Sequence, residues 1–177
     1  MNAEVNIRAF VEEDTKQVSA LFIAVNRLLA PPHLRDAFEA YIARSLVEEI
    51  DRIADYYGER DGGFWVAVGG DYLLGMFGLE RVADGIMELR RMYVDPAARR
   101  RGIAQEMLRF AEGECRRRRM FRLELSTSEL QGAALSLYRS AGYRLVREAS
   151  ATAMSNKTVV AGIRRFREDS VAAGSVL

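Results

Sequence analysis

The sequence predicts a single domain of the α/β or α+β class, with one mixed β-sheet and helices on both of its faces. Segments with helical periodicity and segments with strand alternation follow one another along the whole chain. The 177 residues are 49% hydrophobic, which is enough for a sizeable core in one domain. The sequence has no repeats, linkers or low-complexity segments. We therefore expect one domain over residues 1–167 and a polar, small-residue tail over residues 168–177.

The N-terminal third is predicted to hold one strand and then two or three helices. Residues 5–8 alternate in polarity, and an apolar stripe predicts a helix over residues 15–29 that ends before two prolines. Apolar positions three and four residues apart predict one further helix, or two joined ones, over residues 33–57. Its other faces carry the acidic residues Glu48, Glu49, Asp51 and Asp55. We interpret them as a solvated helix face, with binding of a cationic amine as the alternative.

The rest of the chain is predicted to alternate between strands and helices. Strands are expected over residues 64–68, 72–79, 86–94 and 122–125, from 143 onward, and over 158–163. Helices are expected over residues 102–119 and around 133–138. The polar run from Ser126 to Glu129 is well suited to begin the second of these helices, and Gly142 to end it.

The composition argues against several kinds of site. The formal net charge of +1 provides no overall attraction to nucleic acid or to an anionic membrane. A single cysteine, Cys115, rules out an internal disulfide, and a single histidine, His33, makes a histidine-ligated metal site unexpected. We expect Cys115 to pack in the core and His33 to cap a helix or face solvent. The sequence shows neither an apolar signal core nor a membrane-spanning run, so we expect a cytoplasmic protein without a metal.

A basic turn between a strand and a helix is the most informative stretch. Pro96 ends the strand predicted over residues 86–94, and Gly102 begins a helix directly after the arginines at 99–101. The first amide groups of a helix lack partners within it, and the helix dipole adds partial positive charge there. Glycine lets a phosphate approach the backbone, and guanidinium groups suit phosphate oxygens. The turn therefore predicts a phosphate site, although it matches neither the Walker pattern nor the dinucleotide fingerprint.

Two motifs resemble signatures of the Gcn5-related N-acetyltransferases. The turn reads Arg99-x-x-Gly102-x-Ala104, which is similar to the pyrophosphate-binding turn of that family. A second stretch carries Tyr138, Gly142 and Tyr143 at the spacing of the family's Asn-x-x-Ala-x-x-Leu-Tyr-x-x-x-Gly-Phe segment, with Gln131 in place of Asn. The order of the elements also matches from about residue 4 to 166. The resemblance implies a mostly antiparallel sheet and the acyl-coenzyme A acyltransferase fold.

The same resemblance implies acetyl-coenzyme A as the co-substrate. In the family, freed backbone groups of the central strand bind the pantetheine arm, and the turn binds the pyrophosphate. Carried over position by position, this implies the cofactor-binding residues Met92, Tyr93, Val94, Arg99, Arg100, Arg101, Gly102, Ile103, Ala104, Gln131 and Tyr138. The backbone amide of Met92 is the expected oxyanion donor. Three segments, at 63–68, 88–94 and 127–131, look like the family's camello-like branch.

Two side chains are expected to carry the chemistry, in which a neutral amine attacks a thioester. Tyr138 is similar to the family's general acid, because a phenol stays protonated at neutral pH; simple packing is the alternative. Glu88 stands where some members carry the glutamate that deprotonates the amine, directly or through water. Glu80 is the rival base, and pairing of Glu88 with a neighbouring arginine is the structural alternative. Direct attack fits the family better than transfer through Cys115.

The expected reaction moves an acetyl group to a primary amine, with a small molecule as the acceptor. The alternatives are a protein lysine or N-terminal acetyltransferase and a non-catalytic acyl-coenzyme A sensor on the same fold. An RNA-binding role for the arginines at 116–119 is disfavoured, since no aromatic residues interleave with them. We expect neither a nucleic-acid nor a membrane partner, and a homodimer remains open.

Overall fold

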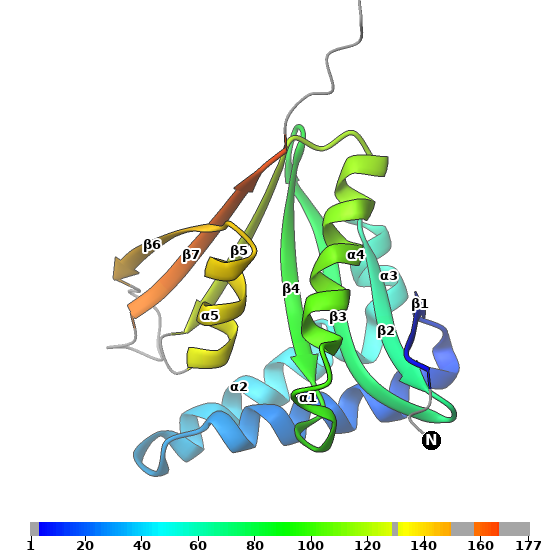
Figure 1. Cartoon of the computed structure of the whole chain (residues 1–177). Coiled ribbons are helices and arrows are strands. Elements are labelled where there is room, and N and C mark those ends of the chain that lie inside the picture. The colour runs from blue at the N-terminus through cyan, green and yellow to red at the C-terminus, as the bar shows by residue number, and fades with distance from the viewer. Residues whose placement is uncertain (1–3, 129–130, 150–157, 167–177) are drawn as a thin grey trace, which may run out of the picture.

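The computed structural model describes residues 4–128, 131–149 and 158–166 (Figure 1). The predicted tail at 168–177 lies outside this part. The strands are β1 (Asn6–Ala9), β2 (Gly63–Gly69), β3 (Tyr72–Ala83), β4 (Ile86–Val94), β5 (Arg122–Ser128), β6 (Arg144–Ala149) and β7 (Thr158–Arg165). The helices are α1 (Thr15–Leu29), α2 (Arg35–Glu48), α3 (Ile53–Gly58), α4 (Ile103–Arg117) and α5 (Gly132–Ser140). Short 3-10 turns are η1 (Glu12–Asp14), η2 (Pro32–Leu34), η3 (Ile50–Arg52) and η4 (Pro96–Ala98).

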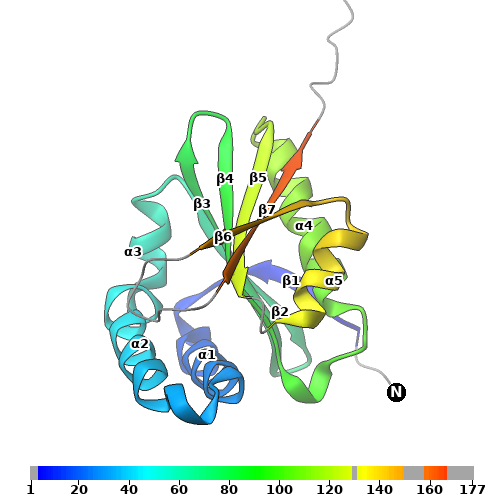
Figure 2. The same ribbon diagram turned by 90° about the vertical axis from the view of Figure 1, so that its left-hand side faces the viewer.

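The strands form one seven-stranded sheet in the order β1-β2-β3-β4-β5-β7-β6. Neighbouring strands run antiparallel except β4 and β5, which are parallel. Helices α4 and α5 lie on one face of this sheet and α1, α2 and α3 on the other (Figures 1 and 2). The predicted fold class, a mixed and mostly antiparallel sheet with helices on both faces, is therefore confirmed.

Each face of the sheet has its own apolar core, as two helical layers require. On one face, α4 buries the stripe Met107, Leu108, Ala111 and Cys115 against strands β3, β4 and β5. On the other face, α1 buries Val18, Leu21, Phe22 and Val25, as its apolar stripe predicts. Cys115 is thus a packing residue, and His33 is exposed in η2, in agreement with the expectations for both.

Most element predictions are confirmed, and one is wrong. The helix over 15–29 and the strand over 86–94 have the predicted bounds, and the segment over 33–57 is resolved into η2, α2, η3 and α3. The polar run from Ser126 does not begin a helix. Ser126 and Thr127 continue β5, because they pair with Ala161 and Val160 of β7. The residues 129–130 lie outside the described part, and α5 starts at Gly132.

Strand β4 carries two irregularities that shape the site. Its pairing with β5 covers only four residue pairs, from Ile86↔Arg122 to Leu89↔Leu125, after which the two strands diverge (Figure 1). Its register with β3 also shifts between Arg90 and Tyr93, where two residues of β4 oppose one of β3. This is a β-bulge, and Arg91 within it has a positive φ of 53°. Backbone groups of β4 beyond Leu89 are therefore left unpaired on the side of β5.

Candidate functional site

A cleft of about 450 Å³ opens where β4 and β5 diverge. Its walls are the end of β4, the basic turn, the first turn of α4 and the start of α5, with two side chains of α1. The lining residues are Val25, Leu29, Met92, Tyr93, Val94, Ala98, Arg99, Arg100, Gly102, Ile103, Ala104, Gln105, Gln131, Gly132, Ala133, Ala134 and Leu137. Nine of the predicted cofactor residues thus lie together in one cleft.

The basic turn has the geometry of an anion site. Gly102 caps α4 with φ of 78°, a left-handed conformation that favours glycine, and a side chain there would meet open space. The first amide to bond within the helix is that of Glu106, so the preceding amides of α4 remain available at the cleft. The Asp95 side chain accepts a hydrogen bond from the Ala97 amide at 2.7 Å and fixes the turn.

Two predicted cofactor residues lie elsewhere. Arg101 points to a separate cleft of about 670 Å³ between α1, β3 and the turn, because successive residues of the turn face different sides. Tyr138 lies on the buried side of α5, 5% exposed, with its ring 5.7 Å from that of Tyr143. Burial, with a smaller effect from Tyr93, raises the pKa of Tyr138 well above its usual value. Its hydroxyl therefore stays protonated at neutral pH.

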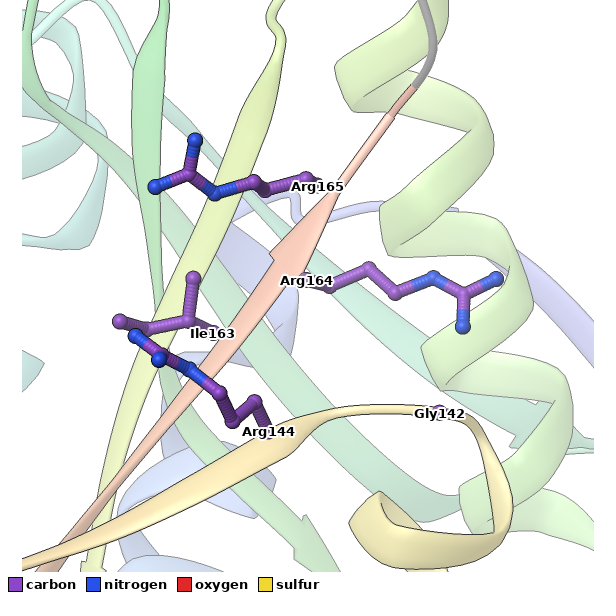
Figure 3. A pocket seen from close by; sticks show the side chains of 5 residues that line it. All are labelled: Gly142, Arg144, Ile163, Arg164 and Arg165. Carbon is purple, nitrogen blue, oxygen red and sulfur yellow. The ribbon is translucent and has the colours of Figure 1, made fainter.

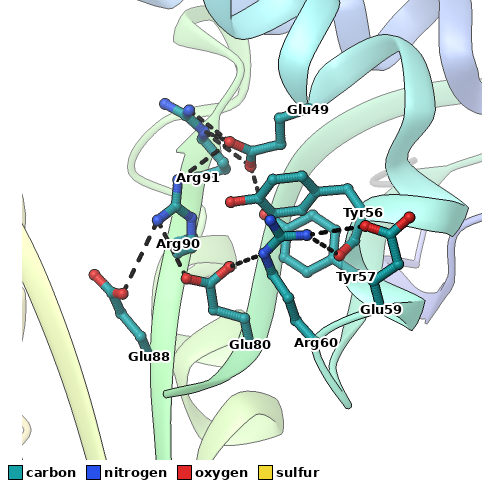
Figure 4. Close-up of polar contacts among 9 residues, drawn as sticks. All are labelled: Glu49, Tyr56, Tyr57, Glu59, Arg60, Glu80, Glu88, Arg90 and Arg91. Atoms are coloured by element: carbon teal, nitrogen blue, oxygen red, sulfur yellow. Dashed lines mark hydrogen bonds and ion pairs between the residues drawn. The ribbon is translucent and has the colours of Figure 1, made fainter.

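Three glutamates form a row across the opposite face of the sheet. Glu88 of β4 is the direct cross-strand partner of Glu80 in β3 and of Glu124 in β5. Like charges in such positions repel each other unless cations intervene. Arginines supply the compensation: Arg90 lies 3.3 Å from Glu80 and 3.9 Å from Glu88 (Figure 4), and Arg122 lies 2.9 Å from Glu124.

The two candidate bases differ in how tightly they are held. Glu80 is contacted by Arg90 and by Arg60 at 3.6 Å, and only 10% of its side chain is exposed. Glu88 has a single ion-pair contact within the described residues, the distant one to Arg90, and 26% of its side chain is exposed. Burial, together with the charges of Glu80, Glu124 and Glu49, raises the pKa of Glu88 against the opposing effect of Arg90. Of the two, Glu88 is the more accessible proton acceptor.

The β-bulge is fixed by a buried network around Glu49, which lies between α2 and η3. Glu49 accepts hydrogen bonds from Arg91 Nη2 at 2.6 Å, Arg90 Nη2 at 3.2 Å and Tyr57 Oη at 2.7 Å (Figure 4). Arg91 also donates to the hydroxyl of Tyr41. Both arginines point to the same face, which a regular strand would not allow for neighbours. The bulge thus links β4 to the helices α2 and α3.

This network corrects the interpretation of Glu49 as part of a solvated face or an amine site. Glu49 is only 2% exposed, and Arg90 and Arg91 balance its charge. Burial opposes its ionisation, but the hydrogen bonds and charges of Arg91, Tyr57 and Arg90 outweigh that effect and lower the pKa of Glu49. Glu49 is therefore an ionised structural residue. The sequence separation of 42 residues between Glu49 and Arg91 explains why no local pattern reveals the pair.

A model described as the acetyltransferase (GNAT) family matches residues 30–143. The chain belongs to the GNAT family. The human protein N-acetyltransferase 8 is 30% identical to this GNAT chain over 110 residues, which are 59% of the chain and 48% of that protein. The chain spans about half the length of the curated relatives it matches. Membership of the camello-like branch stays a prediction.

Solved structures agree with this GNAT assignment at the level of the fold. A GNAT-family acetyltransferase from Staphylococcus aureus has a TM-score of 0.75 at 17% identity, over 93% of this chain and 100% of that one. The PaiA N-acetyltransferase of Thermoplasma acidophilum, solved in complex with coenzyme A, has a TM-score of 0.73 at 18% identity, over 92% and 99%. Within the described part of this chain, no helix is both long and apolar enough to cross a bilayer.

Proposed function

We propose that this protein is an N-acetyltransferase that moves an acetyl group from acetyl-coenzyme A to the primary amine of a small molecule. The observation that carries the proposal is the continuous cleft from the basic turn to the unpaired edge of β4. On the other face of the same strand lies Glu88, an accessible carboxylate with a raised pKa. Family membership adds support for the reaction class.

The residues of the cleft fit coenzyme A. Free amides at the start of α4, with Arg99 and Arg100, suit a pyrophosphate, and the open space at Gly102 allows close approach. The apolar side chains of Met92, Val94 and Leu137 suit an uncharged arm. The unpaired backbone of β4 beyond Leu89 offers hydrogen bonds in the manner of an added strand. When bound, acetyl-coenzyme A supplies an activated thioester.

Three groups of the chain take part in the proposed reaction: Glu88 and Tyr138 each transfer one proton, and the amide of Met92 stabilises negative charge. A neutral amine attacks the thioester, and Glu88 accepts, directly or through water, the proton that the nitrogen loses as the carbon–nitrogen bond forms. The amide of Met92 donates a hydrogen bond to the carbonyl oxygen as negative charge develops on it. Tyr138 gives its proton to the sulfur as the carbon–sulfur bond breaks. Burial raises the pKa of the Cys115 thiol to about 12, so a covalent route through this residue is not part of the proposal.

The test is release of free thiol from acetyl-coenzyme A in the presence of a panel of primary amines, lysine peptides and peptide N-termini. Turnover that is fastest with a small amine supports the proposal. Fastest turnover with a peptide would instead indicate a protein acetyltransferase. Tight binding of acetyl-coenzyme A without turnover of any amine would indicate a binding module on the same fold.

A further inference from the structure

A third cleft, of about 500 Å³ and basic, lies at the other end of the sheet, on strands β6 and β7. Its lining residues are Gly142, Arg144, Ile163, Arg164 and Arg165. Figure 3 shows that Arg144, Ile163 and Arg165 project to one side of β7, whereas Arg164 projects toward α4. Arg164 accordingly lies 4.0 Å from Glu112 of that helix. The first three residues therefore belong to the opposite face of the sheet.

This face is the one that carries the glutamate row. Arg144 pairs with Ile163, Ile163 pairs with Glu124, and Glu124 pairs with Glu88, so all four side chains stand in one cross-strand line. Arg165 lies two residues beyond Ile163 and shares its side. Adjacent strands are about 4.8 Å apart, which places the backbone of β7 roughly 10 Å from Glu88 before the reach of an arginine is counted.

The arginines next to the glutamate row are paired with carboxylates of described residues, and Arg144 and Arg165 differ from them. Arg90, Arg91 and Arg60 are engaged by the carboxylates of Glu49 and Glu80. Arg122 is engaged by Glu124 at 2.9 Å. Arg144 and Arg165 are both exposed, and neither forms an ion pair with another described residue. Two exposed guanidinium groups beside a cleft, without an ion-pair partner among the described residues, attract an anionic group.

We propose that Arg144 and Arg165 bind an anionic group, a carboxylate or a phosphate, on the acceptor whose amine meets Glu88. The inference rests on the proposed function and narrows its substrate to small amphoteric amines. A lysine side chain or a polyamine would place a cation or a neutral amide at the arginines instead of an anion. Ile163 lies between the two ends and suits a short apolar linker.

Matched pairs of acceptors test this assignment at fixed acetyl-coenzyme A. The pairs are γ-aminobutyrate with aminobutanol, for a carboxylate, and phosphoethanolamine with ethanolamine, for a phosphate. Because charge-assisted contacts are strong, kcat/KM should favour one anionic member by roughly tenfold to a hundredfold. In the double variant Arg144→Gln/Arg165→Gln that ratio should fall toward one, while kcat/KM for the neutral member stays within about twofold.

The control variant is Arg109→Gln, which makes the same kind of substitution once, on the exposed side of α4 and on the opposite face. It should leave every ratio unchanged, and a melting curve for each variant verifies folding. Equal kcat/KM for the members of both pairs in the wild type would overturn the anion site while leaving the proposed function intact. No turnover with any amine would overturn the proposed function. In that case calorimetry measures the binding of butyrate. Binding by the wild type that is lost in the double variant supports the anion site, and absence of binding by the wild type overturns it.

Discussion

The substitution Glu49→Gln tests whether the buried network supports the β-bulge. Glutamine keeps the size of the side chain but removes its charge and turns one acceptor into a donor. In the wild type both carboxylate oxygens accept from donors, with Arg91 Nε at 3.1 Å from each and Tyr57 Oη at 2.7 Å from one. The variant would therefore direct an N–H group at other donors. It would also leave Arg91, 10% exposed, without its carboxylate.

The expected loss of stability is large for a single substitution. Removing one partner of a buried ion pair costs about 3–5 kcal/mol, because the remaining charge stays out of water. In a domain of this size each kcal/mol lowers Tm by about 2–4 °C, so a fall on the order of 10 °C is expected. Cofactor affinity should also fall, because Arg91 belongs to the bulge next to the Met92 amide.

Thermal unfolding followed by circular dichroism measures the effect, and Glu39→Gln is the matched control. Glu39 makes a pair of similar length with Arg27, 2.8 Å, but 49% of its side chain is exposed. The same chemical change there should leave Tm unchanged within error, since exposed pairs are screened by water. Equal Tm values for the wild type and Glu49→Gln would refute the reasoning.

The pH dependence supplies a second check on Glu49. Its pKa in the folded protein is lowered, so its ionised form is favoured by folding. The wild type should hold its full advantage over Glu49→Gln above the unfolded-state pKa of about 4.3, and lose it as the pH falls through the lower folded value. A gap in Tm that widens in acid would contradict this sign.

Three further predictions concern catalysis. Glu88→Gln should lower kcat by roughly 10²-fold or more, and wild-type kcat/KM should rise with pH through the raised pKa of Glu88; a variant with the same rate and pH profile would remove Glu88 as the base. Gly102→Glu should weaken coenzyme A binding in calorimetry by at least about tenfold, since it strains a left-handed turn and places an anion at the phosphate site. Tyr138→Phe should reduce kcat while leaving the Kd for coenzyme A nearly unchanged; full turnover would assign Tyr138 to packing.

The parts of the fold that depend on neighbours in sequence were predictable. The helix over 15–29 and the strand over 86–94 follow from local periodicity and from the prolines that end them. The run from Ser126 was not predictable, because side chains suited to a helix start were incorporated into β5 by pairing with a strand much later in the chain. Whether such a polar segment forms a helix or a strand depends on its pairing with distant strands more than on local preference.

The candidate site also contains parts that the sequence predicts and parts that it does not. The basic turn is a local motif, and its residues from Arg99 to Ala104 gather at one cleft, Arg101 excepted. The β-bulge at Arg91 has no sequence signature, because a non-glycine residue with positive φ depends on the contacts around it. Glu49 was placed on a solvated face for the same reason. The charged residues around it, Glu48, Asp51 and Arg52, are exposed, and the break between α2 and η3 turns Glu49 inward.

The short pairing of β4 with β5 has a kinetic consequence. Only four residue pairs join the half-sheet β1–β4 to the half-sheet β5–β7. The face of the sheet that carries Glu88, where the acceptor is proposed to bind, includes strands of both halves. Arg90 lies on one half and Arg144 on the other. A pantetheine arm bound along the free edge of β4 would bridge the halves and fix their separation. We therefore expect an ordered reaction, in which acetyl-coenzyme A binds first and the acceptor meets a groove of its final width only afterwards.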